Sequence, residues 1–138
     1  MTQKTPRFLV ADDIAVNRQL LSYFLRGYGQ VDFAQDGQEV LEKFLAAYKE
    51  GTSYDAIFLD IMMPVADGQE ALRNIRSFEA TQGLGVNKEV KVVMVTSLGD
   101  YDNLKESLKQ GAVEYLVKPV KEAGFKQLLG RLGFNRVG

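Results

Sequence analysis

The chain alternates between short apolar runs and longer segments in which apolar residues recur at helical spacing. Five runs, rich in β-branched and aromatic residues, are RFLVA (7–11), QVDFA (30–34), YDAIFLD (54–60), VKVVMVT (90–96) and VEYLVK (113–118). Most of them are continuously apolar, as expected for strands that are covered on both faces of a sheet. They therefore predict a parallel sheet between two layers of helices.

The segments between and after these runs predict amphipathic helices. Their apolar positions at helical spacing, predicted to face the core, are Val16, Leu20 and Phe24; Val40, Leu41, Phe44 and Leu45; Ala71, Leu72, Ile75 and Phe78; Leu104 and Leu108; and Phe125, Leu128 and Leu129. Asp36 precedes Glu39 by three positions, and Asp67 precedes Glu70 in the same way. These spacings are typical of capping pairs, which predicts the starts of the second and third helices.

Five successive strand–helix units predict an α/β fold, a doubly wound five-stranded parallel sheet with helices on both faces and right-handed connections. A chain of 138 residues fits one domain. The segments 49–53 and 80–89 are predicted loops, the second a mobile one containing Gly83 and Gly85. Little chain follows the last helical pattern, so we expect a single domain over 1–138 with its core at about 7–132.

The amino-acid composition excludes several kinds of binding site and catalytic group. Seventeen basic and eighteen acidic residues give a net charge of -1 without a basic block, which argues against a sequence-independent nucleic-acid surface. The chain has neither cysteine nor histidine, so disulfides, thiolate metal sites, the usual general base and the usual zinc ligand are excluded. No apolar stretch has the length of a signal peptide or a membrane span, so we expect a cytoplasmic protein without membrane contact.

Polar side chains gather at the carboxyl ends of the predicted strands. Asp12 and Asp13 follow the first run, Asp60 ends the third, and Thr96 and Lys118 end the fourth and fifth. Ligands of open parallel α/β sheets bind outside these strand ends, so we expect the five side chains to share one pocket.

Three carboxylates and one ammonium group leave negative charge that a hard divalent cation would neutralise. With oxygen ligands alone, the pocket favours Mg²⁺, with Mn²⁺ as an acceptable substitute, over zinc. A carboxylate beside Mg²⁺ and a lysine can attack a phosphoryl group, because both cations neutralise charge on the transferring oxygens.

Four motifs, in order, resemble the receiver domain of two-component response regulators, including the chemotaxis-type receiver. They are ADD (11–13), LDIMMPVADG (59–68), VTS (95–97) and YLVKP (115–119). The resemblance extends from about Arg7 to Leu132 and implies the flavodoxin-like strand order 2-1-3-4-5.

The resemblance also implies the roles of the acidic residues. Asp60 is the expected phospho-acceptor. Asp12 and Asp13 are expected to hold Mg²⁺ together with Asp60 and the backbone carbonyl of Met62. The donor would be a phosphohistidine on a histidine kinase or histidine phosphotransfer protein, since this chain contains no histidine.

The remaining motif residues are expected to bind and sense the phosphoryl group. Lys118 resembles the phosphate-binding lysine, followed by Pro119, which is usually cis in the family. Thr96 resembles the switch hydroxyl and Tyr115 the switch aromatic residue, although Tyr115 also fits plain strand packing. A downstream protein would bind the fourth helix, fifth strand and fifth helix.

The function implied is that of a phosphorylation-dependent signalling switch that catalyses only its own phosphorylation and dephosphorylation. Because the pair Asn17–Arg18 is frequent in receivers of hybrid histidine kinases, a receiver excised from such a kinase and a phosphorelay intermediate remain alternatives.

Three rival functions fit less well. An aspartyl-phosphate phosphohydrolase of the haloacid-dehalogenase type carries a second aspartate two residues after the nucleophile, where this chain has Met62. A flavin-binding electron carrier needs a glycine- and hydroxyl-rich turn after the first strand, and DDIAVN (12–17) is acidic instead. A degenerate receiver that docks partners without phosphorylation would not need the complete set of side chains found here.

Several residues in or near these motifs are expected to have structural roles. Asp67 is expected to be a helix cap and not a metal ligand. The methionines Met62, Met63 and Met94 are expected to pack in the core. Met62 and Leu98 also stand two positions after Asp60 and Thr96, on the family's water path to the acyl phosphate. Two apolar side chains cannot orient a water molecule, so we expect a long-lived phosphoryl group.

Overall fold

The computed structural model describes residues 5–63 and 67–136. Residues 64–66, which belong to the predicted motif at 59–68, lie outside the described residues, as do both ends of the predicted single domain. The strands are β1 (Arg7–Ala11), β2 (Gln30–Ala34), β3 (Ala56–Asp60), β4 (Lys91–Thr96) and β5 (Glu114–Val117). The helices are α1 (Ala15–Leu25), α2 (Gly37–Lys49), α3 (Gly68–Thr81), the 3₁₀ turn η1 (Val86–Lys88), α4 (Tyr101–Lys109) and α5 (Glu122–Arg131).

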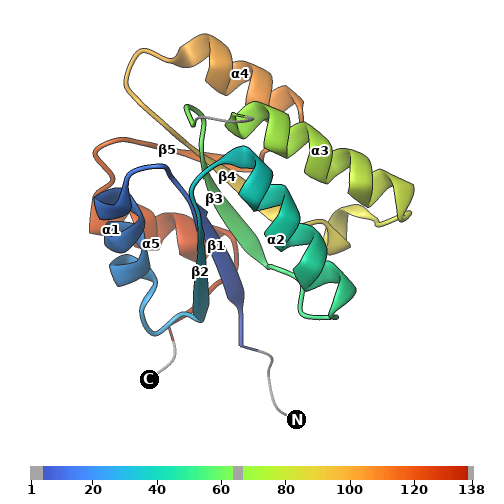
Figure 1. Ribbon diagram of the computed structural model, residues 1–138. Coiled ribbons are helices and arrows are strands. Elements are labelled where there is room, and N and C mark those ends of the chain that lie inside the picture. Colours follow the sequence, from blue (N-terminus) through green and yellow to red (C-terminus); the bar gives the residue numbers. More distant parts are fainter. Residues whose placement is uncertain (1–4, 64–66, 137–138) are drawn as a thin grey trace.

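The five strands form one sheet in the order β2-β1-β3-β4-β5, and all neighbouring strands are parallel. Helices α1 and α5 cover one face, and α2, α3 and α4 cover the other (Figure 1). The predicted fold class and strand order are therefore confirmed. Within the described residues, no helix combines the length and the apolar character that crossing a bilayer requires.

Successive side chains of the central strands point to opposite faces of the sheet, so each face has its own hydrophobic core. Phe8 and Val10 of β1 pack with α1 and α5, whereas Leu9 and Ala11 belong to the cluster with α2 and α3. Strands β3 and β4 are buried in the same way on both faces, which explains their continuously apolar sequence. The edge strand β5 differs, because alternate residues along it are exposed.

The predicted core face of α1 is wrong at two of its three positions. Val16 and Leu20 are 68% and 42% exposed, and the buried residues of this helix are Leu21, Phe24 and Leu25. A spacing of four residues advances about 40° around a helix at each step, so a row of three such positions drifts off the core face. Leu108 of α4 is exposed as well, and Leu104 and Ser107 are the buried residues of that helix.

Both predicted capping pairs are confirmed. Asp36 accepts a hydrogen bond from the backbone N–H of Glu39 at 2.8 Å, and Asp67 accepts one from Glu70 at 2.9 Å. The prediction of one loop over 80–89 is wrong at its start, because α3 continues to Thr81, and the segment also contains η1. The buried Glu79 and the helix former Ala80 lie in the last turn of α3, and the helix ends two residues before the first glycine, Gly83.

A buried carboxylate joins three segments at the amino edge of the sheet. Glu79 of α3 is 1% exposed, and it accepts hydrogen bonds from Arg76 at 2.5 Å and from the backbone N–H of Val90 at 2.7 Å. Arg76 also donates to the carbonyl oxygen of Gly111 at 2.8 Å. The pair therefore ties α3 to the start of β4 and to the turn before β5.

Replacing Glu79 by alanine should lower the free energy of unfolding by about 3 kcal/mol, because Arg76 and the Val90 N–H lose a buried partner. Urea denaturation followed by circular dichroism measures the change. The matched control is Glu106→Ala at an exposed position of α4, for which we expect a change within about 0.5 kcal/mol. Equal effects of the two substitutions would contradict a structural role for Glu79.

Candidate functional site

The parallel sheet brings the polar strand ends to one edge. Asp60 is the last residue of β3, and Asp12 directly follows β1. These two strands are neighbours, with Ala11 opposite Leu59, so the two aspartates emerge side by side. The backbone N–H of Asp12 still pairs with the carbonyl oxygen of Ala34, which extends the β1–β2 pairing by one residue. The local backbone thus fixes where these acids stand.

Three carboxylates form one cluster at this edge. One oxygen of each of Asp12, Asp13 and Asp60 can be chosen so that all three lie within 4.8 Å of one another. Asp12 and Asp60 are buried, and Asp13 is exposed. The cluster is therefore open to solvent on the Asp13 side, where a hydrated cation can enter.

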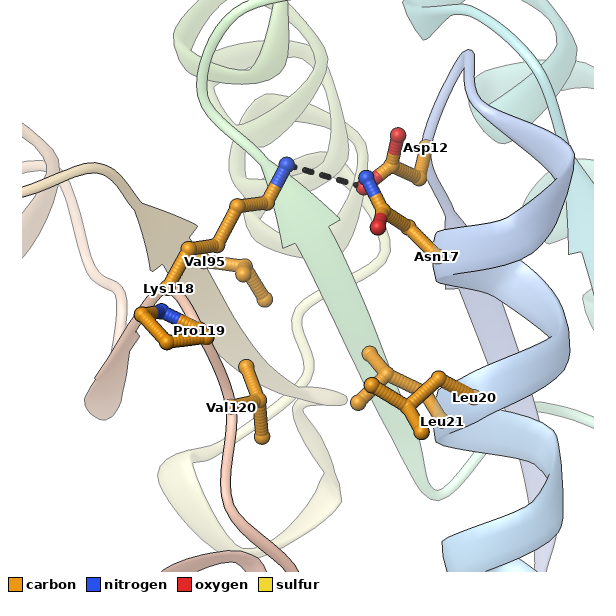
Figure 2. Close-up of a pocket in the computed structure, with 8 residues that line it drawn as sticks. All are labelled: Asp12, Asn17, Leu20, Leu21, Val95, Lys118, Pro119 and Val120. Atoms are coloured by element: carbon orange, nitrogen blue, oxygen red, sulfur yellow. Dashed lines mark ion pairs between the residues drawn. The ribbon is translucent and has the colours of Figure 1, made fainter.

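Lys118 crosses from the end of β5 to the cluster, as Figure 2 shows for its contact with Asp12. Its Nζ lies 3.1 Å from Asp12 Oδ2 and 3.1 Å from Asp60 Oδ2. Burial opposes the charge of Lys118, but hydrogen bonds and the charges of both aspartates outweigh it and raise its pKa above 10.5. The peptide bond before Pro119 is cis, as expected.

The carboxyl group of Asp60 is held in a place that disfavours its charge. Burial raises the pKa of Asp60 above 3.8, and the negative charge of Asp12 adds to this effect. Lys118 and the backbone N–H of Met62, which donates to Asp60 Oδ1 at 3.1 Å, act in the opposite direction. Three carboxylates against one ammonium leave a formal charge of minus two, so a divalent cation fits this donor set in charge and in ligand type.

Neither of the two expected switch residues forms a hydrogen bond with the acidic cluster in the part of the chain that the structure describes, and both line a groove beside α4. Thr96 is buried at the end of β4, and its hydroxyl donates to the carbonyl oxygen of Ser97 at 3.3 Å. Tyr115 is 45% exposed on β5 and lines a groove beside α4 together with Leu98 and Tyr101. Tyr115 therefore has room to move without disturbing the core.

The prediction that Met62 packs in the core is wrong, whereas Met63 and Met94 are buried as predicted. Met62 is 66% exposed because the chain has already left the sheet after Asp60 and runs along the rim of the cluster. Leu98 is 80% exposed after the end of β4. Both apolar side chains thus face solvent near the strand ends.

A groove of about 320 Å³ lies beside the cluster, between α1 and the segment that connects β5 to α5 (Figure 2). Its polar end is formed by Asp12, Asn17 and Lys118, and its apolar wall includes Leu20 and Val120. Asn17 and Val120 line this groove but were not among the site residues predicted from the sequence. The polar residues at 17–19 between apolar neighbours are the signal that points to this side of α1.

Comparison with known proteins agrees with this geometry. The family model of the response regulator receiver domain matches residues 8–130. The osmosensing histidine protein kinase SLN1 of Saccharomyces cerevisiae is 32% identical over 125 residues, which are 89% of this chain and 10% of that protein. This chain therefore spans a small part of the length of that relative.

Two solved structures share the fold at similar sequence identity. One contains the receiver domain of the S. cerevisiae response regulator Ssk1 in complex with the histidine phosphotransfer protein Ypd1; the match has 28% identity and a TM-score of 0.81, and covers 96% of this chain and 92% of that one. The other is the receiver domain of the Pseudomonas aeruginosa sensor histidine kinase PA1611 with a magnesium ion in its active site cleft, with 28% identity, a TM-score of 0.74, and coverage of 94% and 98%. On the fold, the strand-end cluster and the family match, this chain belongs to the response regulator receiver domain family.

Proposed function

We propose that the chain is a phosphorylation-dependent signalling switch whose phospho-acceptor is Asp60. The observation that carries this proposal is the acidic cluster with Lys118 bound between Asp12 and Asp60. The site combines a nucleophile, a cation-binding pair and a fixed ammonium group, which together serve phosphoryl transfer.

Asp12, Asp13, Asp60 and the backbone carbonyl of Met62 would hold Mg²⁺. When bound, the ion neutralises negative charge on the transferring oxygens and keeps Asp60 ionised despite its burial. That a magnesium ion occupies the cleft of the related PA1611 receiver supports this assignment. Mn²⁺ would occupy the same oxygen ligands.

A carboxylate oxygen of Asp60 would attack the phosphorus atom of a phosphohistidine. The P–O bond to Asp60 forms as the P–N bond breaks, and the electron pair of that bond remains on the imidazole nitrogen of the donor. Lys118 would bind an oxygen of the phosphoryl group while that group is transferred from the donor to Asp60. The Thr96 hydroxyl would then exchange its contact with Ser97 for the phosphoryl group, which shifts the population toward an active surface.

The donor would be a histidine kinase or a histidine phosphotransfer protein, in line with the Ypd1–Ssk1 complex and the kinase SLN1. The exposed apolar row Val16, Leu20 and Tyr23 of α1 leads to the groove that ends at Lys118, so a donor seated on α1 would reach Asp60. A downstream protein would use α4, β5 and α5, where Tyr101 of α4 and Tyr115 of β5 are exposed. We also propose that the protein acts in the cytoplasm and that residues 1–138 form a single receiver domain. This domain would catalyse only its own phosphorylation and dephosphorylation.

The substitution Leu20→Asp should slow phosphoryl transfer from a histidine phosphotransfer protein about tenfold, because it puts a charge into an apolar contact. Labelling by acetyl phosphate should stay unchanged, since a small donor needs no docking surface. Transfer is measured with a phosphorylated phosphotransfer protein that labels the wild type. Leu108→Asp on α4, with 39% exposure against 42% for Leu20, is the matched control and should transfer normally.

Phosphorylated protein should lose its phosphoryl group slowly, because the exposed Met62 and Leu98 cannot orient a water molecule. Misorientation of a reactant costs up to about a hundredfold, and we expect Met62→Asn with Leu98→Asn to speed the loss about tenfold. Intact mass against time measures both rates. Hydrolysis of the wild type within seconds at room temperature would refute the explanation, as would an unchanged rate in the double variant.

Incubation with acetyl phosphate and Mg²⁺, followed by intact mass, tests the function itself. We expect one phosphoryl adduct per chain and no continuing release of phosphate from a phosphate ester. Steady turnover of the ester would favour the phosphohydrolase instead. Failure to form an adduct, together with no response to beryllofluoride, would favour a receiver that docks partners without phosphorylation.

A further inference from the structure

The guanidinium group of Arg18 reaches back from α1 to the acidic cluster. Its Nη1 donates to the backbone carbonyl oxygen of Asp12 at 2.7 Å, and the contact is partly buried. This carbonyl belongs to the peptide that links Asp12 to Asp13, just beyond the end of β1. The arginine therefore acts on the backbone between two members of the cluster.

Arg18 is poorly placed for stabilising its own helix. It is the fourth residue of α1, close to the positive end of the helix dipole, where a cation is unfavourable. The first turn contains no acidic residue, and the N-cap residue Ile14 makes no side-chain cap. The contact with Asp12, and not an interaction with the helix dipole, accounts for a cation at this position.

The contact matters more for Asp13 than for Asp12. Asp12 is held by its N–H to Ala34, by the N–H of Ile14 on Oδ1 at 2.9 Å, and by Lys118 on Oδ2. Asp13 is exposed, and its direction depends on the peptide that precedes it. We infer that Arg18 is a positioning residue for the cation site, which fixes the Asp12–Asp13 peptide so that the Asp13 carboxylate faces that of Asp60. This inference rests on the proposed cation site.

The charge of Arg18 and its hydrogen bond to the Asp12 carbonyl should affect cation affinity in opposite directions. A guanidinium beside a cation site repels the cation, so removal of its charge alone would tighten binding. Loss of the fixed peptide would instead weaken binding, since Asp13 would no longer be held toward Asp60. The sign of the change in affinity therefore separates the two roles.

Titration with Mn²⁺, with free ion followed by electron paramagnetic resonance, measures the affinity without phosphorylation. We expect Arg18→Met to raise the dissociation constant about tenfold, as is common when the partner of a metal ligand is removed. Arg18→Lys, which keeps a donor, should restore part of the affinity. Arg26→Met removes the same charge at the far end of α1, where Arg26 contacts the carbonyl of Tyr23, and should bind like the wild type.

Far-UV circular dichroism of each variant confirms that the fold is intact, and Arg18→Ala, which also lacks the donor, decides the question if Arg18→Met does not fold. Unchanged or tighter Mn²⁺ binding by folded Arg18→Met, or by Arg18→Ala in its place, would overturn the positioning role while leaving the cation site in place. A wild type that binds no Mn²⁺ would overturn the proposed cation site and this inference with it.

Discussion

Replacing Asp60 by asparagine is expected to abolish the phosphoryl adduct formed with acetyl phosphate and Mg²⁺. An amide has no anionic oxygen with which to attack phosphorus, and the other two acids of the cluster are assigned to the cation. The substitution should not unfold the protein, because burial already raises the pKa of Asp60 and a neutral group of the same shape avoids the cost of a buried charge. Intact mass detects the adduct, and the thermal midpoint reports the fold.

The matched control for this variant is Asp67→Asn. Asp67 is exposed and caps α3, and asparagine caps a helix about as well as aspartate. This variant should acquire the adduct at the wild-type rate. An adduct on Asp60→Asn with the wild-type yield would remove Asp60 from its proposed role and leave the acceptor to be found by peptide mapping.

Replacing Lys118 by methionine should slow phosphorylation by acetyl phosphate about a hundredfold, the usual effect of removing one group that stabilises charge in a transition state. The rate should fall because the variant loses the ammonium group of Lys118. Within the described residues, this is the only ammonium group that contacts both Asp12 and Asp60. Cation binding should be strengthened in the same variant, because Lys118 and the cation compete for the same carboxylates. Phosphorylation rate and Mn²⁺ affinity, measured on one preparation, should therefore change in opposite directions.

Lys121→Met supplies the comparison for Lys118, since Lys121 lies three residues further along the chain and is exposed at the start of α5. It should be phosphorylated normally and bind Mn²⁺ like the wild type. A Lys118→Met variant that is phosphorylated as fast as the wild type would show that the two ion pairs are only structural. Parallel loss of Mn²⁺ binding and phosphorylation would mean that Lys118 holds the carboxylates in place instead of acting on the phosphoryl group.

The sequence by itself determined the sheet and the membership of the acidic cluster. Strands buried on both faces must be apolar along their whole length, so their ends are visible as the points where charge begins. In a parallel sheet, these ends meet at one edge, which is why Asp12, Asp60 and Lys118 could be expected to come together. The capping pairs of α2 and α3 were predictable for a similar reason, since they depend on residues three positions apart.

Only the tertiary structure decided which face of a helix is covered and which polar groups are shared between segments. Val16 and Leu20 fit a helical period, but the packing of α1 on the sheet leaves both exposed, and Leu20 forms part of the wall of the groove. Helical period gives the spacing of a buried face and not its width or its direction, because these depend on the neighbour against which the helix packs. The exposure of Met62 has the same origin, since burial is a property of the whole fold.

Long-range polar contacts are the other part that the sequence left undetermined. Lys118 lies 58 positions from its partner Asp60, and Glu79 accepts a hydrogen bond from Val90 across the connection from α3 to β4. Arg18 is an ordinary helix residue in the sequence, and its contact with the Asp12 carbonyl exists because the chain turns back after β1. Such pairings carry no periodic signal, because each side chain is paired by the packing of elements and not by its neighbours in the chain.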